Sequence, residues 1–188
     1  MGKSIITKQE IKRVTKELIM EKGYYAVTMN DICLHTGISA GGLYYHYHSV
    51  EEILQEIIHS ETEDVWNMFE HIENKKQFLN AVDQYFEHEK QDYLKFDETL
   101  NGILYEYYFS FPTEKRKEIL YSVYQETYEK LSGILIKLID RKLLKNVCNH
   151  IYLTLQGLSF MAMSKALTEE MIDAEFQRLK DEIERSLV

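Results

Sequence analysis

The feature that most constrains the fold of this chain is the stretch TMNDICLHTGISAGGLYYHYH, residues 28–48. Thr28 can cap a short helix, and Asp31, three positions later, can complete a capping box with it. Gly37 stands where the chain must turn sharply, because glycine adopts a positive φ at little cost. Ser39 can cap a second helix that runs to Tyr47. Two short capped helices joined by a tight turn are the layout of a helix-turn-helix, whose second helix enters the DNA major groove.

The rest of the chain predicts helices. Apolar residues recur at three- and four-residue spacing, and one proline and eight glycines in 188 residues are too few for an all-β protein. We therefore expect an all-α fold of about nine helices. Gly23 should end the first in a left-handed cap, and Ser49 with Glu52 should open the fourth in a capping box. Outside the motif, the expected helices cover 7–22, 49–71, 76–92, 97–109, 113–142, 146–165 and 169–187.

Two domains are expected, a DNA-binding head over 5–57, with its motif at 28–47, and a larger body over 58–188. The helix at 146–165 is apolar around most of its circumference, so it must be covered on several faces. The last helix carries apolar residues in near-heptad spacing, which suits a helix–helix seam. We expect both helices to pair with their copies in a four-helix bundle, making a homodimer. The near-heptad residues are Ile172, Phe176, Leu179, Ile183 and Leu187.

Charge is unevenly distributed. Residues 1–50 hold six Lys or Arg and four acids, a net +2, so the −9 of the whole chain leaves −11 for residues 51–188. A basic head on an acidic body fits a head that faces DNA. The alternative is a solvated surface on which charged residues cluster by chance. Cys33 and Cys148 lie in separate segments, so we expect reduced thiols and a cytoplasmic protein. No nucleophile–base pair and no convincing metal-ligand set stands at a recognisable spacing, so we expect no enzyme, cofactor or metal.

Several features occur in a fixed order along the first domain. A helix ends in Glu21-Lys22-Gly23-Tyr24, the Thr28 cap and the Gly37-Ile38-Ser39 turn follow, and Leu43-Tyr44-Tyr45-His46-Tyr47 ends the second motif helix before Ser49-Val50-Glu51-Glu52-Ile53-Leu54. With this order, residues 7–57 resemble the DNA-binding head of the TetR family of bacterial repressors. The body resembles the family in length, helix count and the Gly157-Leu158 pair. The Leu-Tyr-Tyr-His run and the overall size look like those of its multidrug-sensing members.

The resemblance implies which residues meet DNA. Gly41 and Gly42 would allow close approach, and the helix N-terminus at Thr28 would face phosphate. Two positions depart from the family pattern: Tyr47 replaces the usual Phe, and Val50 replaces a Lys that contacts phosphate. Lys3, Lys8 or Lys12 would then have to supply that charge. The implied DNA-binding residues are Thr28, Ser39, Ala40, Gly41, Gly42, Tyr44, Tyr45 and His46.

In the TetR family the body helices enclose an effector pocket. The body of this chain is rich in aromatic residues, which suits a lipophilic, aromatic or cationic small molecule. Glu89, Glu106 or Glu126 would add negative charge for a cation. Ordinary core packing is the alternative for each aromatic residue. The implied ligand-binding residues are Trp66, Phe69, Tyr85, Phe86, Glu89, Tyr105, Tyr108, Tyr124 and Tyr128.

The expected function is therefore a ligand-responsive DNA-binding regulator, a dimeric repressor of a near-palindromic operator. The alternative is an all-α small-molecule-binding or scaffold protein whose helix-turn-helix does not bind DNA. Val50 and the glycine pair Gly41-Gly42 favour this alternative.

Overall fold

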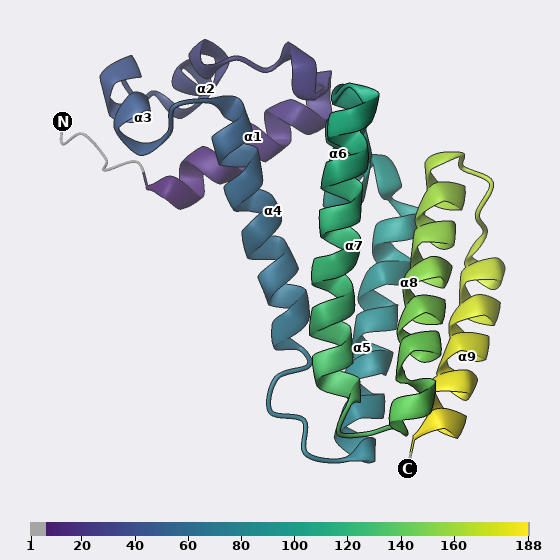
Figure 1. The fold of residues 1–188 in the computed structure, drawn as a ribbon. Helices are drawn as coiled ribbons and strands as arrows, with labels where there is room; N and C mark the ends of the chain where they lie inside the picture. The colour runs from purple at the N-terminus through teal and green to yellow at the C-terminus, as the bar shows by residue number, and fades with distance from the viewer. Residues whose placement is uncertain (1–6, 188) are drawn as a thin grey trace. The chain divides into compact units, whose positions relative to one another are not determined.

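The computed structural model describes residues 7–187 and confirms the all-α class (Figure 1). The chain divides into two compact units between Asp64 and Val65. Over 7–187 the only extended pairing is a single antiparallel bridge between Ile139 and Leu187. In the same part of the chain, no helix combines the length and the hydropathy that a membrane crossing requires.

The first unit contains the helix-turn-helix. Its elements are α1 (Lys8–Lys22), a short 3-10 turn (Tyr24–Ala26), α2 (Met29–Thr36), α3 (Ala40–His46) and α4 (Val50–Asn67), whose last turn crosses into the second unit. Apolar side chains from all four α-helices meet in one small core, which holds α3 against α2 and α1. The fully buried members of this core include Ile11, Ile32, Leu43, Tyr47, Ile53 and Leu54.

The predicted helix caps of the motif are confirmed. The Thr28 hydroxyl accepts a hydrogen bond from the Asp31 N–H, and the Asp31 carboxylate accepts one from the Thr28 N–H at 2.8 Å, which is a complete capping box. Gly37 ends α2 at φ 73°, ψ 7°, in the left-handed region that favours glycine. The Ser39 hydroxyl accepts from the Gly42 N–H at 3.2 Å and caps α3.

Two predicted caps differ in detail. Gly23 has a positive φ of 82°, but its ψ of 153° lies outside the left-handed helical region because the chain enters the 3-10 turn there. The Ser49 hydroxyl does accept from the Glu52 N–H. The Glu52 carboxylate, however, accepts from the N–H of His48 at 2.6 Å, one residue before the position that a capping box requires.

α4 ends at Asn67, so the prediction of a helix to residue 71 is wrong. The next N–H groups, beginning with Met68 to the Val65 carbonyl, bond three residues back instead of four, and this tightens and ends the helix. His71 then adopts φ 57°, which a continuing helix does not allow.

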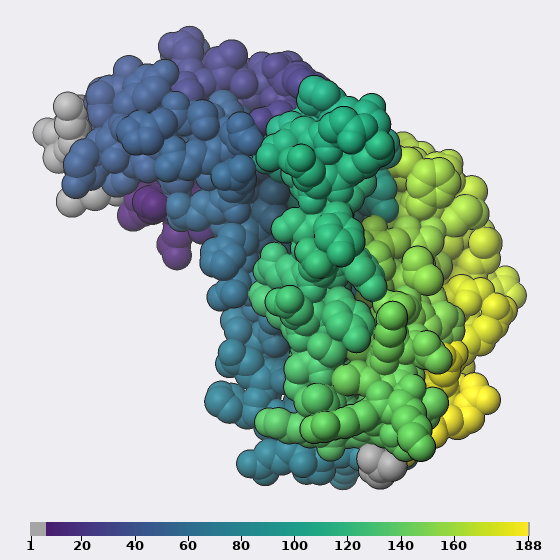
Figure 2. Space-filling model, in the orientation of Figure 1, coloured from purple at the N-terminus to yellow at the C-terminus, as the bar shows by residue number. Residues whose placement is uncertain are grey.

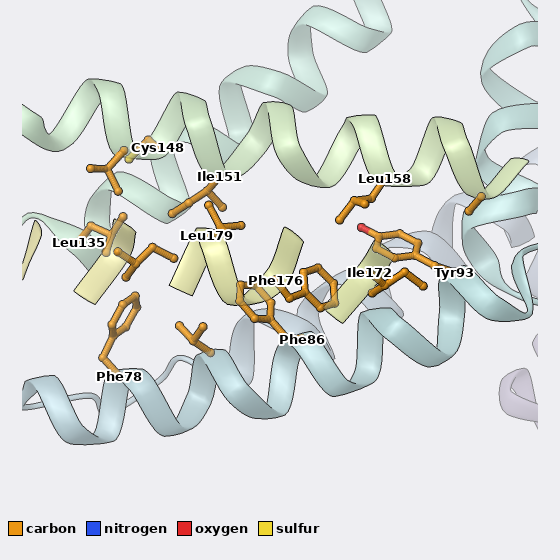
Figure 3. Packing of buried hydrophobic residues seen from close by; sticks show 14 of the residues in the cluster. Phe78, Phe86, Tyr93, Leu135, Cys148, Ile151, Leu158, Ile172, Phe176 and Leu179 are labelled. Carbon is orange, nitrogen blue, oxygen red and sulfur yellow. The ribbon is translucent and has the colours of Figure 1, made fainter. Parts of the chain in front are cut away.

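The second unit contains α5 (Lys75–Leu94), a 3-10 turn (Phe96–Glu98), α6 (Leu100–Ser110), α7 (Thr113–Leu135), α8 (Arg141–Met163) and α9 (Glu169–Ser186). Its core is built mainly where α5, α8 and α9 meet, as Figure 3 shows. The rings of Phe86 and Phe176 stack there at a centroid distance of 4.3 Å. α7 packs along α8, and the two form the green and yellow-green surface of the body in Figure 2.

The prediction of one helix over 113–142 is wrong. α7 ends at Leu135, and the Leu138 N–H bonds three residues back to the Leu135 carbonyl. Asp140 then caps α8 by accepting a hydrogen bond from the Lys142 N–H at 2.8 Å, so α8 begins five residues before the predicted 146.

The apolar stripe of α9 is a seam within the chain. Ile172, Phe176, Leu179 and Ile183 are all buried in the core of the second unit. The near-heptad spacing therefore reflects packing of α9 on α5 and α8. A second copy of the chain would have to use a different face of α9.

Candidate functional site

The exposed face of α3 is the first candidate site. Leu43 and Tyr47 anchor this helix in the core of the head, and the rotation of an α-helix then turns the side chains between them outward. Tyr44 is 49% exposed and Tyr45 is 85% exposed, with the Tyr45 ring edge-on to His46 at 5.2 Å. Two large aromatic side chains that are exposed side by side form an apolar patch on this small unit. Exposed apolar patches are typical of binding surfaces.

The two glycines at the start of α3 differ in their surroundings. A Cβ added to Gly42 would lie 3.0 Å from Cγ1 of Ile38, so packing within the head accounts for this glycine. A Cβ added to Gly41 would meet nothing within 4 Å. Nothing inside the head therefore requires glycine at position 41, where Ser39 and Ala40 beside it are also exposed.

Thr28 lies at the exposed N-terminus of α2. Its hydroxyl donates to the Asp31 carboxylate at 2.6 Å, and Lys22 lies 3.0 Å from the same carboxylate. The Thr28 hydroxyl and then Lys22 lower the pKa of Asp31 to about 2. The hydroxyl of Thr28 has one proton and it is used inside the head, so the free donors at this point of α2 are backbone N–H groups.

The basic side chains of the head are engaged with carboxylates of the same unit. Lys8 and Lys12 of α1 both lie near Glu56 of α4, at 2.8 and 3.8 Å. Lys16 pairs with Glu61 at 2.6 Å, so the three lysines form a ladder of ion pairs between α1 and α4. Arg13 pairs with Glu10 and Glu17 on its own helix, and Lys22 pairs with Asp31 as described above.

This engagement bears on the lysine that is missing at position 50. Lys8 and Lys12 were two of the three candidates to replace it, and both contact Glu56 instead. The third candidate, Lys3, lies outside the described residues. The exposed face of α3 itself contributes tyrosine, histidine, serine and glycine, and no lysine or arginine.

Tyr47 ends α3 in place of the usual phenylalanine. Its ring is 1% exposed, and its hydroxyl has no hydrogen-bond partner at bonding distance. The Lys8 ammonium lies 4.8 Å from the ring centroid. Burial, and then the Glu56 carboxylate, raise the pKa of Tyr47.

The aromatic residues of the body lie in several groups of ring contacts. In the first, Tyr85 contacts Phe69 at 5.9 Å and Phe86 at 6.0 Å between ring centroids. Phe86 is stacked on Phe176 and buried, so core packing accounts for it.

A second group lies on α7 and its neighbours. Tyr124 contacts Tyr128 at 6.2 Å and Tyr152 of α8 at 5.1 Å. Trp66 lies under the Lys130 ammonium, 5.5 Å away. Tyr108 is half-buried on α6, and burial first raises the pKa of its hydroxyl to about 12.

Glu89 lies on α5 between Tyr85 and Tyr93, one helical turn from each. Its side chain is half-buried, and desolvation raises its pKa to about 7 although hydrogen bonds to Tyr93 and Tyr85 act in the opposite direction. The Tyr93 hydroxyl donates to the Leu155 carbonyl of α8 at 3.2 Å, and Ser159 of α8 lowers the pKa of Tyr93 and of Tyr105, against the effect of burial. Tyr93, Tyr152 and Ser159 were not among the residues predicted from the sequence, although the i, i+4, i+8 spacing of residues 85, 89 and 93 is visible in it.

Comparison with known proteins identifies the first unit. Residues 11–57 match the model of the bacterial regulatory proteins of the tetR family. An uncharacterized HTH-type transcriptional regulator of Bacillus subtilis (strain 168), YfiR, is 25% identical over 133 residues. That match covers 70% of this chain and 65% of the relative, just under two thirds of its length.

Solved structures show the same fold over nearly the whole chain. A transcriptional regulator from Aquifex aeolicus VF5, described as TerR/AcrR family, has a TM-score of 0.69 and 22% identity over 95% of this chain and 98% of its own. A complex of SmeT with triclosan has a TM-score of 0.71 and 15% identity over 96% of this chain and 91% of its own. Residues 11–57, which contain the capped helix-turn-helix, therefore match the tetR family of bacterial regulatory proteins, and the chain as a whole shares the fold of these solved structures.

Proposed function

We propose that this protein is a ligand-responsive transcriptional regulator that binds a near-palindromic operator as a homodimer and is released by a small molecule. The observation that carries the proposal is the face of α3. This helix is capped by Ser39, anchored by Leu43, and exposes Tyr44 and Tyr45 beside a glycine that the head itself does not require. A repressor is the form of regulation that the tetR match favours.

On DNA, the N-terminal residues of α3 enter the major groove. The open space at Gly41, with Ser39, Ala40 and Gly42, lets the helix backbone approach the base edges closely. Tyr44, Tyr45 and His46 reach phosphates or bases from the same helix. Thr28 contributes through the N–H groups at the start of α2, where the helix dipole favours a phosphate. The proposed DNA-binding residues are therefore Thr28, Ser39, Ala40, Gly41, Gly42, Tyr44, Tyr45 and His46.

Electrostatic attraction should be modest for a DNA-binding protein. Each Lys and Arg of the described head is engaged with a carboxylate, and Val50 supplies no phosphate contact. Each phosphate contact adds close to one unit to the slope of log affinity against log salt concentration. A protein with few phosphate contacts therefore shows a shallow salt dependence. The affinity then rests on the fit of α3 in the groove and on two heads acting together.

The dimer forms through α8 and α9. α8 exposes Leu153 (66%) and Phe160 (57%) on the side opposite its buried residues, and Gly157 between them has nothing within 4 Å of an added Cβ. An apolar face with a glycine allows close helix packing across a two-fold axis. Two heads placed about 34–36 Å apart would then reach successive major grooves.

The effector binds in the body among the half-buried aromatic residues. α4 carries Trp66 at its end in the second unit and Val50 at its beginning in the first, so this helix belongs to both. The effector lowers DNA binding if it binds more tightly to a conformation of the dimer that does not span two half-sites. The size of the effect is set by the difference between its affinities for the two conformations. The solved complex of SmeT with triclosan supports a small lipophilic ligand for this fold.

The alternative is a small-molecule-binding or scaffold protein that does not bind DNA. The engagement of Lys8 and Lys12 with Glu56 and the valine at position 50 favour it. It predicts a folded dimer that binds small molecules and shows no preference among DNA sequences at any salt concentration.

A binding shift on selected genomic fragments, including the DNA upstream of the gene, distinguishes the two. We expect a saturable, sequence-specific shift for the full chain, and a loss of at least about tenfold in affinity for Tyr45→Ala, the size of one good side-chain contact. Tyr25→Ala is the matched control, because Tyr25 is also an exposed tyrosine of the head, in the 3-10 turn outside α3. A folded dimer that selects no fragment refutes the proposal.

A further inference from the structure

Lys8, the first residue of α1, lies beside the C-terminal end of α3. Its ammonium is 4.8 Å from the ring centroid of Tyr47, the C-cap residue of that helix. Tyr45, two residues before Tyr47, is 85% exposed on the face proposed to meet DNA. A lysine side chain is a flexible stem with a charged end, so the ammonium of Lys8 can turn toward a phosphate beside α3.

Glu56 of α4 holds this ammonium in the free protein. Nζ of Lys8 donates to Oε2 of Glu56 at 2.8 Å, and this hydrogen bond is the main cause that lowers the pKa of the carboxyl. Both side chains are partly open to solvent, 50% exposed for Lys8 and 34% for Glu56. Ion pairs as exposed as this one contribute little to stability, because water solvates both partners well after they separate. The pair is therefore weak enough to open when a DNA phosphate approaches.

Lys12 keeps Glu56 paired when Lys8 leaves. Nζ of Lys12 lies 3.8 Å from the other carboxylate oxygen, Oε1, and also donates to the Ser60 hydroxyl at 3.4 Å. The side chain of Lys12 is 22% exposed, less than half the value for Lys8. The carboxylate thus has two cationic partners, and the more exposed one can leave without stranding a charge.

We propose that Lys8 is a phosphate contact of the DNA complex that Glu56 restrains in the free protein, and that DNA binding exchanges the carboxylate for a phosphate oxygen. This proposal rests on the proposed function, because it adds one residue to the DNA-binding set. α3 contains no lysine or arginine, so Lys8 supplies a positive charge that this helix lacks. Lys8 raises the affinity and its salt dependence, because each neutralised phosphate releases counterions, whereas Glu56 lowers the affinity.

Lys16 provides a comparison within the same ladder of ion pairs. It joins α1 to α4 as Lys8 does, and its ammonium lies 2.6 Å from Glu61. Two turns of α1, about 12 Å along the helix axis, separate Lys16 from Lys8 and from the contact with Tyr47. The same chemistry is therefore present away from the end of α3, where we expect no phosphate contact.

The first test removes the two lysines in turn. Fluorescence anisotropy gives the DNA affinity of the full-length protein between about 50 and 200 mM salt, on the selected fragment and on a random duplex of equal length. Lys8→Met removes the charge and keeps an apolar stem beside the Tyr47 ring. It should lower the log–log salt slope by about 2 for the dimer, since each head loses one phosphate contact. Lys16→Met should leave the slope unchanged, and equal slopes for Lys8→Met and the parent would overturn the proposal.

The second test removes the restraint. Glu56→Gln keeps the size of the side chain and should tighten DNA binding at least about threefold for the dimer, the effect of two exposed ion pairs. Glu61→Gln removes the same charge from the next pair of the ladder, and its smaller gain measures long-range repulsion of DNA alone. Combined with Lys8→Met, the Glu56→Gln change should gain no more than Glu61→Gln does, because Glu56 acts through Lys8. An equal gain from Glu56→Gln with and without Lys8 would overturn the proposal.

The two DNA substrates separate this proposal from the proposed function. Phosphate contacts carry no sequence information, so the random duplex tests the exchange as well as the selected fragment does. Sequence-specific binding whose salt slope ignores Lys8 would refute the exchange alone. A protein that selects no fragment, but binds the random duplex with a slope that depends on Lys8, would refute the proposed function and leave the exchange standing. Absence of binding to any DNA at about 50 mM salt would refute both.

Discussion

Replacing Glu89 with glutamine should remove one well-defined part of the pH dependence of stability. The pKa of this carboxyl is raised from 4.5 in the unfolded chain to about 7 in the folded protein, chiefly by desolvation. Between these values the folded state holds a proton that the unfolded state has lost, so stability falls as pH rises. At 1.36 kcal/mol per pKa unit, the loss totals about 3 kcal/mol, of which about 2.5 kcal/mol falls between pH 5 and pH 8.

The assay is urea unfolding at several pH values, followed by Trp66 fluorescence, which reports on the second unit. Other titrating groups change the stability of both proteins equally, so the quantity to compare is the difference between Glu89→Gln and the parent. This difference should rise by about 2.5 kcal/mol in favour of the variant from pH 5 to pH 8. A constant difference for Glu89→Gln would show that the carboxyl ionises at its ordinary pH, and would refute the desolvation argument.

Three further predictions concern the head. Gly37→Ala should lower the free energy of unfolding by about 1–2 kcal/mol because position 37 has a positive φ, whereas Gly41→Ala should raise it by about 0.5–1 kcal/mol and weaken DNA binding. Thermal unfolding measures the stability of both variants, and fluorescence anisotropy measures their binding to DNA. Equal effects of the two substitutions on stability would contradict the backbone conformations assigned to these glycines. Tyr47→Phe should stabilise the protein by about 1 kcal/mol in urea unfolding, because it removes a buried hydroxyl without a partner, and a destabilised variant would mean that this hydroxyl is bonded. Val50→Lys should tighten DNA binding and steepen the log–log salt slope by about 2 per dimer, and an unchanged slope would place residue 50 away from phosphate.

The sequence was most informative where one residue type has one physical use. Thr28, Gly37 and Ser39 marked the caps and the turn correctly, because hydroxyl caps and positive φ leave few alternatives. Helix ends without such signals were wrong, as at Asn67. There the apolar pattern continues to Phe69 and Ile72, but these residues pack against the body core from beyond the end of the helix.

Which partner an apolar face meets is a property of the assembled fold. The stripe of α9 from Ile172 to Ile183 has the spacing of a helix seam, and periodicity alone does not say whether the other side of that seam is the same chain or a second copy. The ion pairs of Lys8 and Lys12 were missed for the same reason, since Glu56 lies far along the sequence on another helix. Glu89 and Tyr85 were identified from the sequence, whereas the contact of Tyr93 with α8 emerged only from the packing of α5 against that helix.

The most direct test of the central claim is a hydroxyl-radical footprint of the full-length protein on the fragment that it selects. We expect two protected half-sites related by a two-fold axis, with centres about one helical turn of DNA or a multiple of it apart. The protection should disappear in the Tyr45→Ala variant and persist in Tyr25→Ala. Uniform protection without half-sites, or a footprint that is identical in both variants, would contradict the assignment of α3 as the DNA-reading helix.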